Sequence, residues 1–385
     1  MKGFSRRDWL RNCATIGGGL VVTSWIRPES VRAAEGAGES RPSAAESAAI
    51  EGVVTQFRER FQVPGVSIAV ARHGQFVHVE GYGMADQRTV EKVTAEHLFR
   101  IASVSKPITS AAIYWMLDEG KLKLNDLVFG AGGHLEADFG KLAGEFEKQI
   151  TLHQLLTHSV GGWENDGNDP MFLRRRLNQR ELIAWTLEHQ PLKERPGQKY
   201  AYSNFGYCLL GRVLEKLSGQ PYADFVQEAV LAKCGVRGMR IGGNTLAERA
   251  PLEVIYDGQN GGDPYGMNVR RMDAHGGWLA TATDLVRFAM HVDGFSTTPN
   301  ILTPRAVRLM TTGTAANTSY ASGWSVNTVP NWWHEGSLPG TMSILVRTAS
   351  GMCWAILANT RKSGMETEID RLGWKIVQQV PAWRA

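Results

Sequence analysis

The chain has 385 residues, of which 43% are hydrophobic and 21% are charged, and its formal net charge is +4 at pH 7. Residues 1–34 contain six Lys or Arg and two Asp or Glu, which leaves 36 of the 42 basic and 36 of the 38 acidic residues for positions 35–385. This balanced remainder argues against nucleic acid or an anionic membrane surface as a partner.

The N-terminus has the pattern of a twin-arginine signal peptide over residues 1–34. Residues 5–10 (SRRDWL) form the twin-arginine core, an apolar glycine-rich stretch comes next, and residues 31–33 (VRA) form a small-residue cleavage site. The apolar run is too short for a stable membrane span. We therefore expect the twin-arginine export machinery as a partner during secretion and a periplasmic or secreted mature protein.

Residues 35–46 (EGAGESRPSAAE) are small and polar, and they predict a linker. Residues 47–385 show no internal repeat and no further low-complexity break, which is typical of one large domain. The cysteines after the leader are Cys208, Cys234 and Cys353. Their spacing argues against a disulfide framework or a zinc site, although it leaves a single bridge open.

The first half of this domain begins with a predicted helix over 46–61, which ends before Pro64. Residues 65–83 alternate as two strands around a turn at 72–75. A helix is predicted from Ser103 to about residue 120. Residues 125–270 are predicted as helices and loops, with apolar-periodic runs at 180–188 and 205–218.

The second half predicts a helix over 280–293, strands over 342–348 and 352–360 around a turn at Gly351, and a closing helix over 366–380. Strands near both ends with helices between them indicate an α+β fold. We expect one antiparallel sheet built from both ends of the chain and flanked by helices.

Ser103 and Lys106 form the first pair with a chemical interpretation. Serine needs a base within hydrogen-bond reach to become a nucleophile. Positions three apart share one face of a helix, so this spacing places the lysine amine beside the serine hydroxyl. The S-x-x-K pattern alone is weak, and its meaning depends on the other motifs of the chain and on their order.

Two further patterns occur in order after this pair. Tyr202 and Asn204 form Y-x-N, and His334 and Gly336 form H-x-G just before the last strand pair. His275 also begins an H-x-G pattern, but it opens a helix, so we favour His334. A related ordered set, S-x-x-K with S-D-N and K-T-G, marks β-lactamases and penicillin-binding proteins.

The chain resembles the serine β-lactamase/DD-peptidase superfamily in its class C-like branch, which includes esterases, D-aminopeptidases and penicillin-binding proteins. Besides the three motifs, the resemblance rests on the segments FRIASVSKPIT, ITLHQLLTHSVGG, YSNFGYCLLGRVLEKLSGQPY and HGGWLATATDLVRFA. It implies a β-lactamase/transpeptidase-like antiparallel sheet of five or more strands, with a mostly helical second region and a cleft between them. It also implies an acyl-enzyme mechanism that uses no metal and no cofactor.

The resemblance also implies a role for each matching residue. Ser103 would carry the acyl group, and Lys106 would take its proton, directly or with Tyr202. Tyr202, with phenolate character supported by Lys106, would return a proton to the leaving group. Asn204 would hold either the substrate carbonyl or Lys106.

The last motif supplies the substrate-binding edge under the same resemblance. The backbone N–H groups of Ser103 and Ser337 would form the oxyanion hole. His334 would occupy the position of the β-lactamase lysine, beside Gly336. Glu335 stands where Thr or Ser usually helps to bind a substrate carboxylate, and its negative charge would disfavour such a substrate.

We therefore expect an exported serine hydrolase that acts on a small-molecule ester, amide or peptide without a free carboxylate. A DD-carboxypeptidase, a penicillin-binding protein or a weak β-lactamase is the first alternative. The second is a ligand-binding relative without catalysis, which the complete set of Ser103, Lys106 and Tyr202 disfavours.

Overall fold

The computed structural model describes residues 41–139, 142, 144–258 and 262–384. The predicted signal peptide and residues 35–40 of the predicted linker lie outside them. The first helix begins at Ala44 rather than at residue 46, because Ser43 and Glu46 form a capping box at its N-terminus. Residues 44–46 of the predicted linker are therefore helical.

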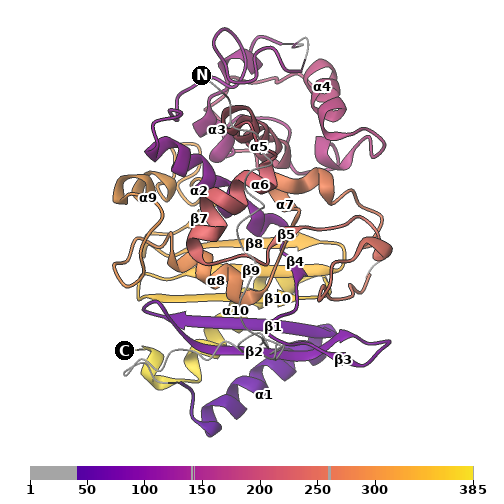
Figure 1. The fold of residues 1–385 in the computed structure, drawn as a ribbon, viewed down its shortest axis with the longest axis vertical. Helices are drawn as coiled ribbons and strands as arrows, with labels where there is room; N and C mark the ends of the chain where they lie inside the picture. Colours follow the sequence, from indigo (N-terminus) through magenta and orange to yellow (C-terminus); the bar gives the residue numbers. More distant parts are fainter. Residues whose placement is uncertain (1–40, 140–141, 143, 259–261, 385) are drawn as a thin grey trace, which may run out of the picture. The chain divides into compact units, whose positions relative to one another are not determined.

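The described chain contains a seven-stranded sheet of order β3-β2-β1-β10-β9-β8-β7, in which all neighbours are antiparallel (Figure 1). Its centre joins the two ends of the chain, because Val66 of β1 pairs with Ala358 of β10. This confirms the predicted fold class. The strands are β1 Gly65–Arg72, β2 Gln75–Asp86, β3 Glu91–Lys92, β7 Ser325–Val326, β8 Trp332–Leu338, β9 Thr341–Arg347 and β10 Met352–Ala358. A second, three-stranded sheet of order β4-β6-β5, which the sequence did not predict, contains β4 Phe99–Arg100, β5 Arg240–Ile241 and β6 Trp278–Ala280.

The helices cover both faces of the large sheet and fill the region beyond it (Figure 1). The predicted long helices are found with shifted ends, and the helix predicted over 280–293 is shorter because β6 precedes it. The helices are α1 Ala44–Phe61, α2 Ser105–Asp118, α3 Leu152–Leu156, α4 Gln179–His189, α5 Asn204–Ser218, α6 Tyr222–Val226, α7 Asp273–Gly276, α8 Ala282–Met290, α9 Pro304–Met310 and α10 Met365–Gln378.

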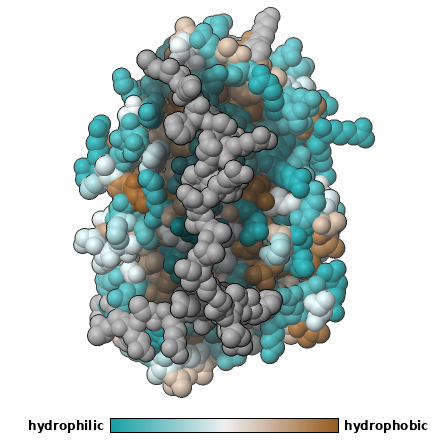
Figure 2. Space-filling view, viewed as in Figure 1, coloured by the Kyte–Doolittle hydropathy of each residue, from teal (hydrophilic) through white to brown (hydrophobic). Residues whose placement is uncertain are grey.

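Strand alternation divides the buried side chains of the central sheet between two large hydrophobic clusters. On β1, Ile68 and Val70 face the cluster that α1 and α10 complete, whereas Ala69 and Ala71 face the larger cluster of the helical region. Burial on both faces explains why the central strands are almost continuously apolar. On the face shown in Figure 2, hydrophilic residues dominate the visible surface and hydrophobic residues form separate patches.

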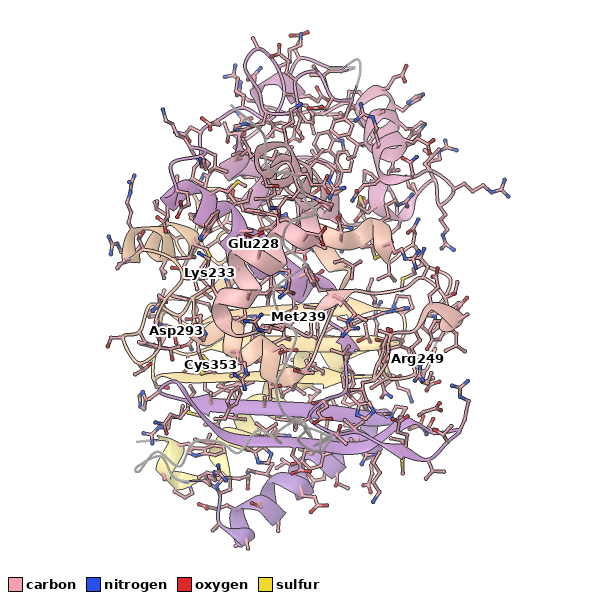
Figure 3. All side chains as sticks on the ribbon, in the orientation of Figure 1. Glu228, Lys233, Met239, Arg249, Asp293 and Cys353 are labelled. Atoms are coloured by element: carbon pink, nitrogen blue, oxygen red, sulfur yellow. The ribbon has the colours of Figure 1, made fainter. Side chains whose placement is uncertain are left out.

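Cys208, Cys234 and Cys353 are all buried and free, so the structure contains none of the bridges that they could form. Cys353 lies on β10, in the part of the sheet against which α8 packs (Figure 3). Burial raises the pKa of each of these thiols above its usual value.

Candidate active site

Ser103 lies in a short 3₁₀ turn, Ala102–Val104, that leads directly into α2. The residue before it, Ala102, is buried and has a φ of 47°, in the left-handed region that residues with a Cβ rarely adopt. Such conformations persist where the surrounding structure imposes them, and they are common at functional sites. The turn leaves Ser103 partly accessible while its neighbours are buried.

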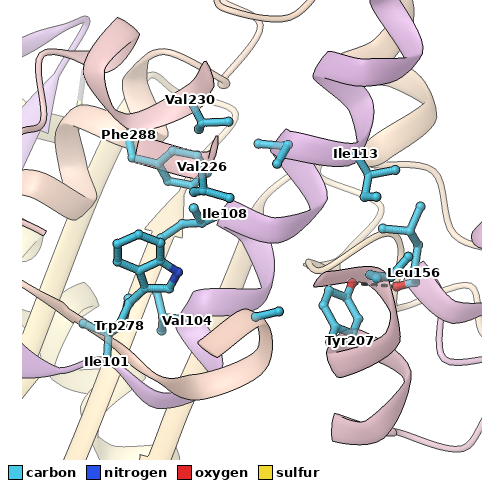
Figure 4. Packing of buried hydrophobic residues seen from close by; sticks show 14 of the residues in the cluster. Ile101, Val104, Ile108, Ile113, Leu156, Tyr207, Val226, Val230, Trp278 and Phe288 are labelled. Atoms are coloured by element: carbon cyan, nitrogen blue, oxygen red, sulfur yellow. Dashed lines mark hydrogen bonds between the residues drawn. The ribbon is translucent and has the colours of Figure 1, made fainter. Parts of the chain in front are cut away.

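The helix after this turn is packed on several sides. Figure 4 shows Ile108 of α2 among Trp278, Phe288 and Val226, while Ile113 faces the side of Tyr207. The Tyr207 hydroxyl donates to the Leu156 carbonyl over 2.8 Å. This packing fixes the first turn of α2, and therefore the position of Lys106 relative to Ser103.

Lys106 is fully buried, and its amine has three hydrogen-bond neighbours. Nζ lies 3.0 Å from Ser103 Oγ, 2.7 Å from Asn204 Oδ1 and 3.0 Å from the His275 carbonyl oxygen. The structure therefore brings together the predicted nucleophile, base and carboxamide. It also shows that the competing H-x-G segment reaches the site through the backbone oxygen of His275.

These contacts suit a neutral lysine. Asn204 Oδ1 and the His275 carbonyl can only accept, so they take two N–H groups of the amine, and its lone pair is left to face the Ser103 hydroxyl. Burial lowers the pKa of Lys106 to about 7, although the Asp169 carboxylate acts in the opposite direction. At neutral pH, a large fraction of Lys106 can therefore accept the Ser103 proton.

Tyr202 is hydrogen-bonded to Ser103, and Lys106 Nζ lies 4.7 Å from the centre of its ring. Burial raises the pKa of this phenol well above its usual value, and the charges of Asp169 and Glu335 act in the same direction. This opposes the phenolate character that the sequence led us to expect. The geometry fits Tyr202 as a neutral proton donor and Lys106 as the base.

Asn204 begins α5, directly after Ser203, whose hydroxyl accepts from the Gly206 N–H and caps the helix. Its Nδ2 donates to Asn165 Oδ1 over 3.0 Å and to Asp169 Oδ2 over 2.8 Å. Of the two roles that the sequence left open, this arrangement gives Asn204 the contact with Lys106.

The H-x-G strand lies against the nucleophile turn. A Cβ at Gly336 would collide with the Ile101 carbonyl oxygen and with Ser343 Oγ. Ser343 itself donates to the Ile101 carbonyl over 2.7 Å. Glycine at position 336 thus lets β8, the strand that also carries Ser337, approach the nucleophile turn closely.

His334 belongs to a buried chain of hydrogen bonds. The Ser203 N–H donates to His158 Nδ1 over 3.1 Å, so His158 carries its proton on Nε2 and donates to Tyr320 Oη over 3.2 Å. Tyr320 then donates to His334 Nε2 over 3.0 Å, and His334 Nδ1 donates to the Glu335 carbonyl over 2.6 Å. Burial and the charge of Lys106 lower the pKa of His334 to about 3, so the ring is neutral.

Glu335 lies on the other face of the sheet. It pairs with Ile344, which belongs to the α1/α10 cluster, whereas His334 pairs with Leu345 of the larger cluster. Burial and the charges of Asp370 and Glu366 on α10 raise the pKa of Glu335 to about 7. The side chain is therefore directed away from the His334 face, although its charge still acts on Tyr202.

The sequence interpretation missed several residues of this site. Asn165 and Asp169 lie in a loop without a recognisable pattern, His158 is not among the predicted site residues, and Tyr320 belongs to no motif. Only the fold brings them to Lys106, Asn204 and His334. A sequence signal existed for His158 alone, as a histidine within the family-like segment ITLHQLLTHSVGG.

Other features of the described residues lie apart from this site. A cavity of about 670 Å³ is lined by residues of α9, β7 and β8, and by Arg347, without any predicted site residue. No cluster of three or more His, Cys, Asp or Glu side chains in the described chain could hold a metal ion. No helix there is long and apolar enough to cross a membrane.

The family model described as Beta-lactamase matches residues 50–378. The chain belongs to the beta-lactamase family. Penicillin-binding protein 4 of Amycolatopsis lactamdurans is 27% identical over 333 residues, which cover 78% of this chain and 82% of that protein. Esterase EstB of Burkholderia gladioli is 32% identical over 232 residues, and the match covers 57% of each chain.

A solved structure supports the same fold for this beta-lactamase family member. D-amino acid amidase from Ochrobactrum anthropi SV3, in complex with L-phenylalanine amide, has a TM-score of 0.72 at 22% identity. The similarity covers 88% of this chain and 99% of the amidase. Together with the family match, these relatives identify the chain as a serine hydrolase with the β-lactamase fold.

Proposed function

We propose that this serine hydrolase cleaves an ester or an amide of a substrate without a free carboxylate, through an acyl-enzyme on Ser103. The observation that carries the proposal is the set of three contacts around Lys106 Nζ. Two acceptors hold its N–H groups, and the lone pair is left for the hydroxyl that must lose its proton.

In the acylation step, Ser103 Oγ attacks the substrate carbonyl carbon, and Lys106 accepts the hydroxyl proton. Backbone N–H groups of Ser103 and Ser337 stabilise the negative charge that develops on the carbonyl oxygen. Neutral Tyr202 donates its proton to the leaving oxygen or nitrogen as that bond breaks, and regains a proton from Lys106. Water then releases the acyl group by the reverse sequence of proton transfers.

The charges around the nucleophile support the substrate class. Among the described residues, the side chains hydrogen-bonded to Ser103, Tyr202 and His334 include no permanently charged cation, because the pKa of Lys106 is about 7. The ionised fraction of Glu335, whose pKa is about 7, adds negative potential near Tyr202. A substrate carboxylate would therefore find no strong partner among these groups, and a neutral or amine-bearing substrate is favoured.

The similarity to a penicillin-binding protein over most of both chains favours one alternative, a DD-carboxypeptidase, penicillin-binding protein or weak β-lactamase. A comparison of three substrates separates the two functions: a short-chain nitrophenyl ester, a D-amino-acid anilide and a chromogenic cephalosporin, each tested against Ser103→Ala. We expect Ser103-dependent turnover of the ester or the anilide. Stable labelling by a fluorescent penicillin without turnover of the other two would support the alternative, and no Ser103-dependent reaction would contradict both.

We also propose that the enzyme is exported by the twin-arginine route, on the pattern of residues 5–10. Replacement of Arg6 and Arg7 together by Lys should retain the protein in the cytoplasm, as measured by cell fractionation with an antibody against the mature domain. An unchanged distribution between the fractions would contradict this route.

A further inference from the structure

The loop of residues 165–169 lies against the Y-x-N segment. The Asn165 N–H donates to the Tyr202 carbonyl over 2.7 Å, and its side-chain oxygen accepts from Asn204. Asp169 is 1% exposed, accepts from the Met171 N–H through Oδ1 over 2.8 Å and from Asn204 through Oδ2. Both oxygens of this buried carboxylate are therefore in use.

The same contacts use the whole carboxamide of Asn204. Its two N–H groups face two oxygens, and its own oxygen faces Lys106 Nζ. A flipped amide would turn its oxygen toward the Asp169 carboxylate, which has no hydrogen to donate, and its N–H groups toward an amine whose lone pair serves Ser103. The Asp169 carboxylate therefore fixes the orientation of the Asn204 carboxamide.

We propose that Asp169 is a positioning residue of this hydrolase: through Asn204 it holds Lys106 against Ser103, and it withdraws the Asn204 amide from substrate binding. Asn165 supports the same orientation. The inference rests on the acyl-enzyme function proposed above for Ser103. It means that the enzyme recognises its substrate without a hydrogen bond from the Asn204 side chain.

The charges around Lys106 allow the influence of Asp169 on its pKa to be measured. The titratable groups that face Lys106 are Tyr202, Tyr207, His158, His275, His334 and Asp169. Burial keeps the three histidines and the two phenols neutral at pH 7, because it lowers the histidine pKa values and raises the phenol pKa values. Asp169, whose pKa is raised by burial to about 6, is then the carboxylate whose charge raises the pKa of Lys106.

The first test is Asp169→Asn, which places one N–H group where an acceptor is needed. We expect kcat/KM for the ester to fall by about 10²-fold, the lower end of what a positioned base contributes. The acidic limb of the pH profile should also move to lower pH, because loss of the carboxylate lowers the pKa of Lys106. A structural defect alone would reduce activity without moving this limb.

Asp166→Asn is the matched control, because it removes the same charge from an exposed position of the same loop. We expect its activity and its acidic limb to stay close to those of the wild type. Equal profiles for Asp166→Asn and Asp169→Asn would overturn the proposal.

A reciprocal exchange keeps the test decisive if Asp169→Asn folds poorly. In the double variant Asp169→Asn with Asn204→Asp, residue 169 donates to residue 204, whose carboxylate still accepts from Lys106. The melting temperature should recover relative to both single variants, and the acidic limb should move above that of the wild type. Lack of recovery together with an unmoved limb would overturn the contact.

The two levels of the proposal fail differently. If wild-type protein shows no Ser103-dependent turnover or labelling by a fluorophosphonate, the proposed function fails, while the recovery of melting temperature still tests the Asp169–Asn204 contact. If Ser103-dependent turnover is present but the double variant shows neither recovery of melting temperature nor a moved acidic limb, the proposed function is supported and the positioning role of Asp169 is contradicted.

Discussion

Tyr320 donates its hydroxyl hydrogen to His334 Nε2 over 3.0 Å, and this bond determines what His334 can offer to the site. Because Nε2 is an acceptor, the ring carries its hydrogen on Nδ1, and Nδ1 donates a hydrogen bond to the Glu335 carbonyl. His334 thus presents no proton to Tyr202. Its ring is neutral and is held by hydrogen bonds at both nitrogens.

The substitution Tyr320→Phe tests the series of hydrogen bonds from His158 through Tyr320 to His334. The change leaves His158 Nε2 and His334 Nε2 without their buried partner, which costs about 1–3 kcal/mol of unfolding free energy. We expect a lower denaturant midpoint and a reduced kcat with a smaller effect on KM. Tyr200→Phe removes a hydroxyl from a neighbouring tyrosine that packs on the same Tyr320 ring, and it should change both quantities less. Equal effects of the two substitutions would contradict a special role for Tyr320.

The pKa of Lys106 should set the acidic limb of kcat/KM near pH 7. Below that pH the amine is charged and has no lone pair for the Ser103 proton, so activity should fall tenfold for each pH unit. The measurement is a pH profile with a neutral ester whose own ionisation is constant. A limb near pH 4, or no limb above pH 5, would exclude Lys106 as the base.

The burial of Lys106 should also make the free energy of unfolding depend on pH. The folded pKa of Lys106 lies below its unfolded value of 10.5, so the unfolded chain binds more protons between these values, and stability rises with pH from about 7 to 10.5. Lys106→Met removes this dependence. The difference in unfolding free energy, variant minus wild type, should therefore decrease across that range in urea titrations, and a constant difference would contradict the lowered pKa.

Gly336→Ala should separate β8 from the nucleophile turn, because its Cβ would meet the Ile101 carbonyl. We expect a loss of about 1–3 kcal/mol of unfolding free energy, as for other overpacked positions, and a large loss of kcat. Gly52→Ala is the contrasting control, since nothing lies within 4 Å of its Cβ and it lies inside α1. That change should stabilise the protein by about 1 kcal/mol. Retained activity in Gly336→Ala would contradict the close approach.

Glu335→Thr should raise the rate of acylation by a chromogenic cephalosporin if the charge of Glu335 repels carboxylate substrates. The side chain lies on the α10 face, so the effect would act over distance and should weaken as salt is added. Glu366→Gln should give no such increase, because loss of the Glu366 charge lowers the pKa of Glu335 and leaves Glu335 more fully ionised. No change in acylation for Glu335→Thr would remove the charge explanation and leave the substrate class to the shape of the site.

The motif residues could be placed from the sequence because their chemistry and order restrict the possibilities. Ser103 and Lys106 share the start of a helix, and Tyr202, Asn204 and His334 converge on them through the fold of the family. The partners of these residues were not predictable in the same way. Asp169 and Tyr320 lie in loop segments with no periodicity, and nothing in their local sequence indicates that they contact Asn204 and His334.

The direction of a side chain was also beyond the sequence interpretation. Glu335 comes directly after His334, but strand alternation and the pairing with Ile344 turn it toward α10. Similarly, the phenol of Tyr202 was expected to have phenolate character, and the degree of burial reversed that expectation. Both outcomes depend on solvent exclusion, which only the assembled structure defines.

The pairing of β1 with β10 has a consequence for how this enzyme is made. β1, near residue 70, pairs with β10, near residue 355. The central sheet can therefore form only after almost the whole chain has left the ribosome. Pairing between strands far apart in the sequence slows folding, because the chain loses the entropy of loop closure before the stabilising contacts form. We therefore expect activity only after nearly the whole domain has been synthesised, and the proposed twin-arginine export would require this folding to precede transport.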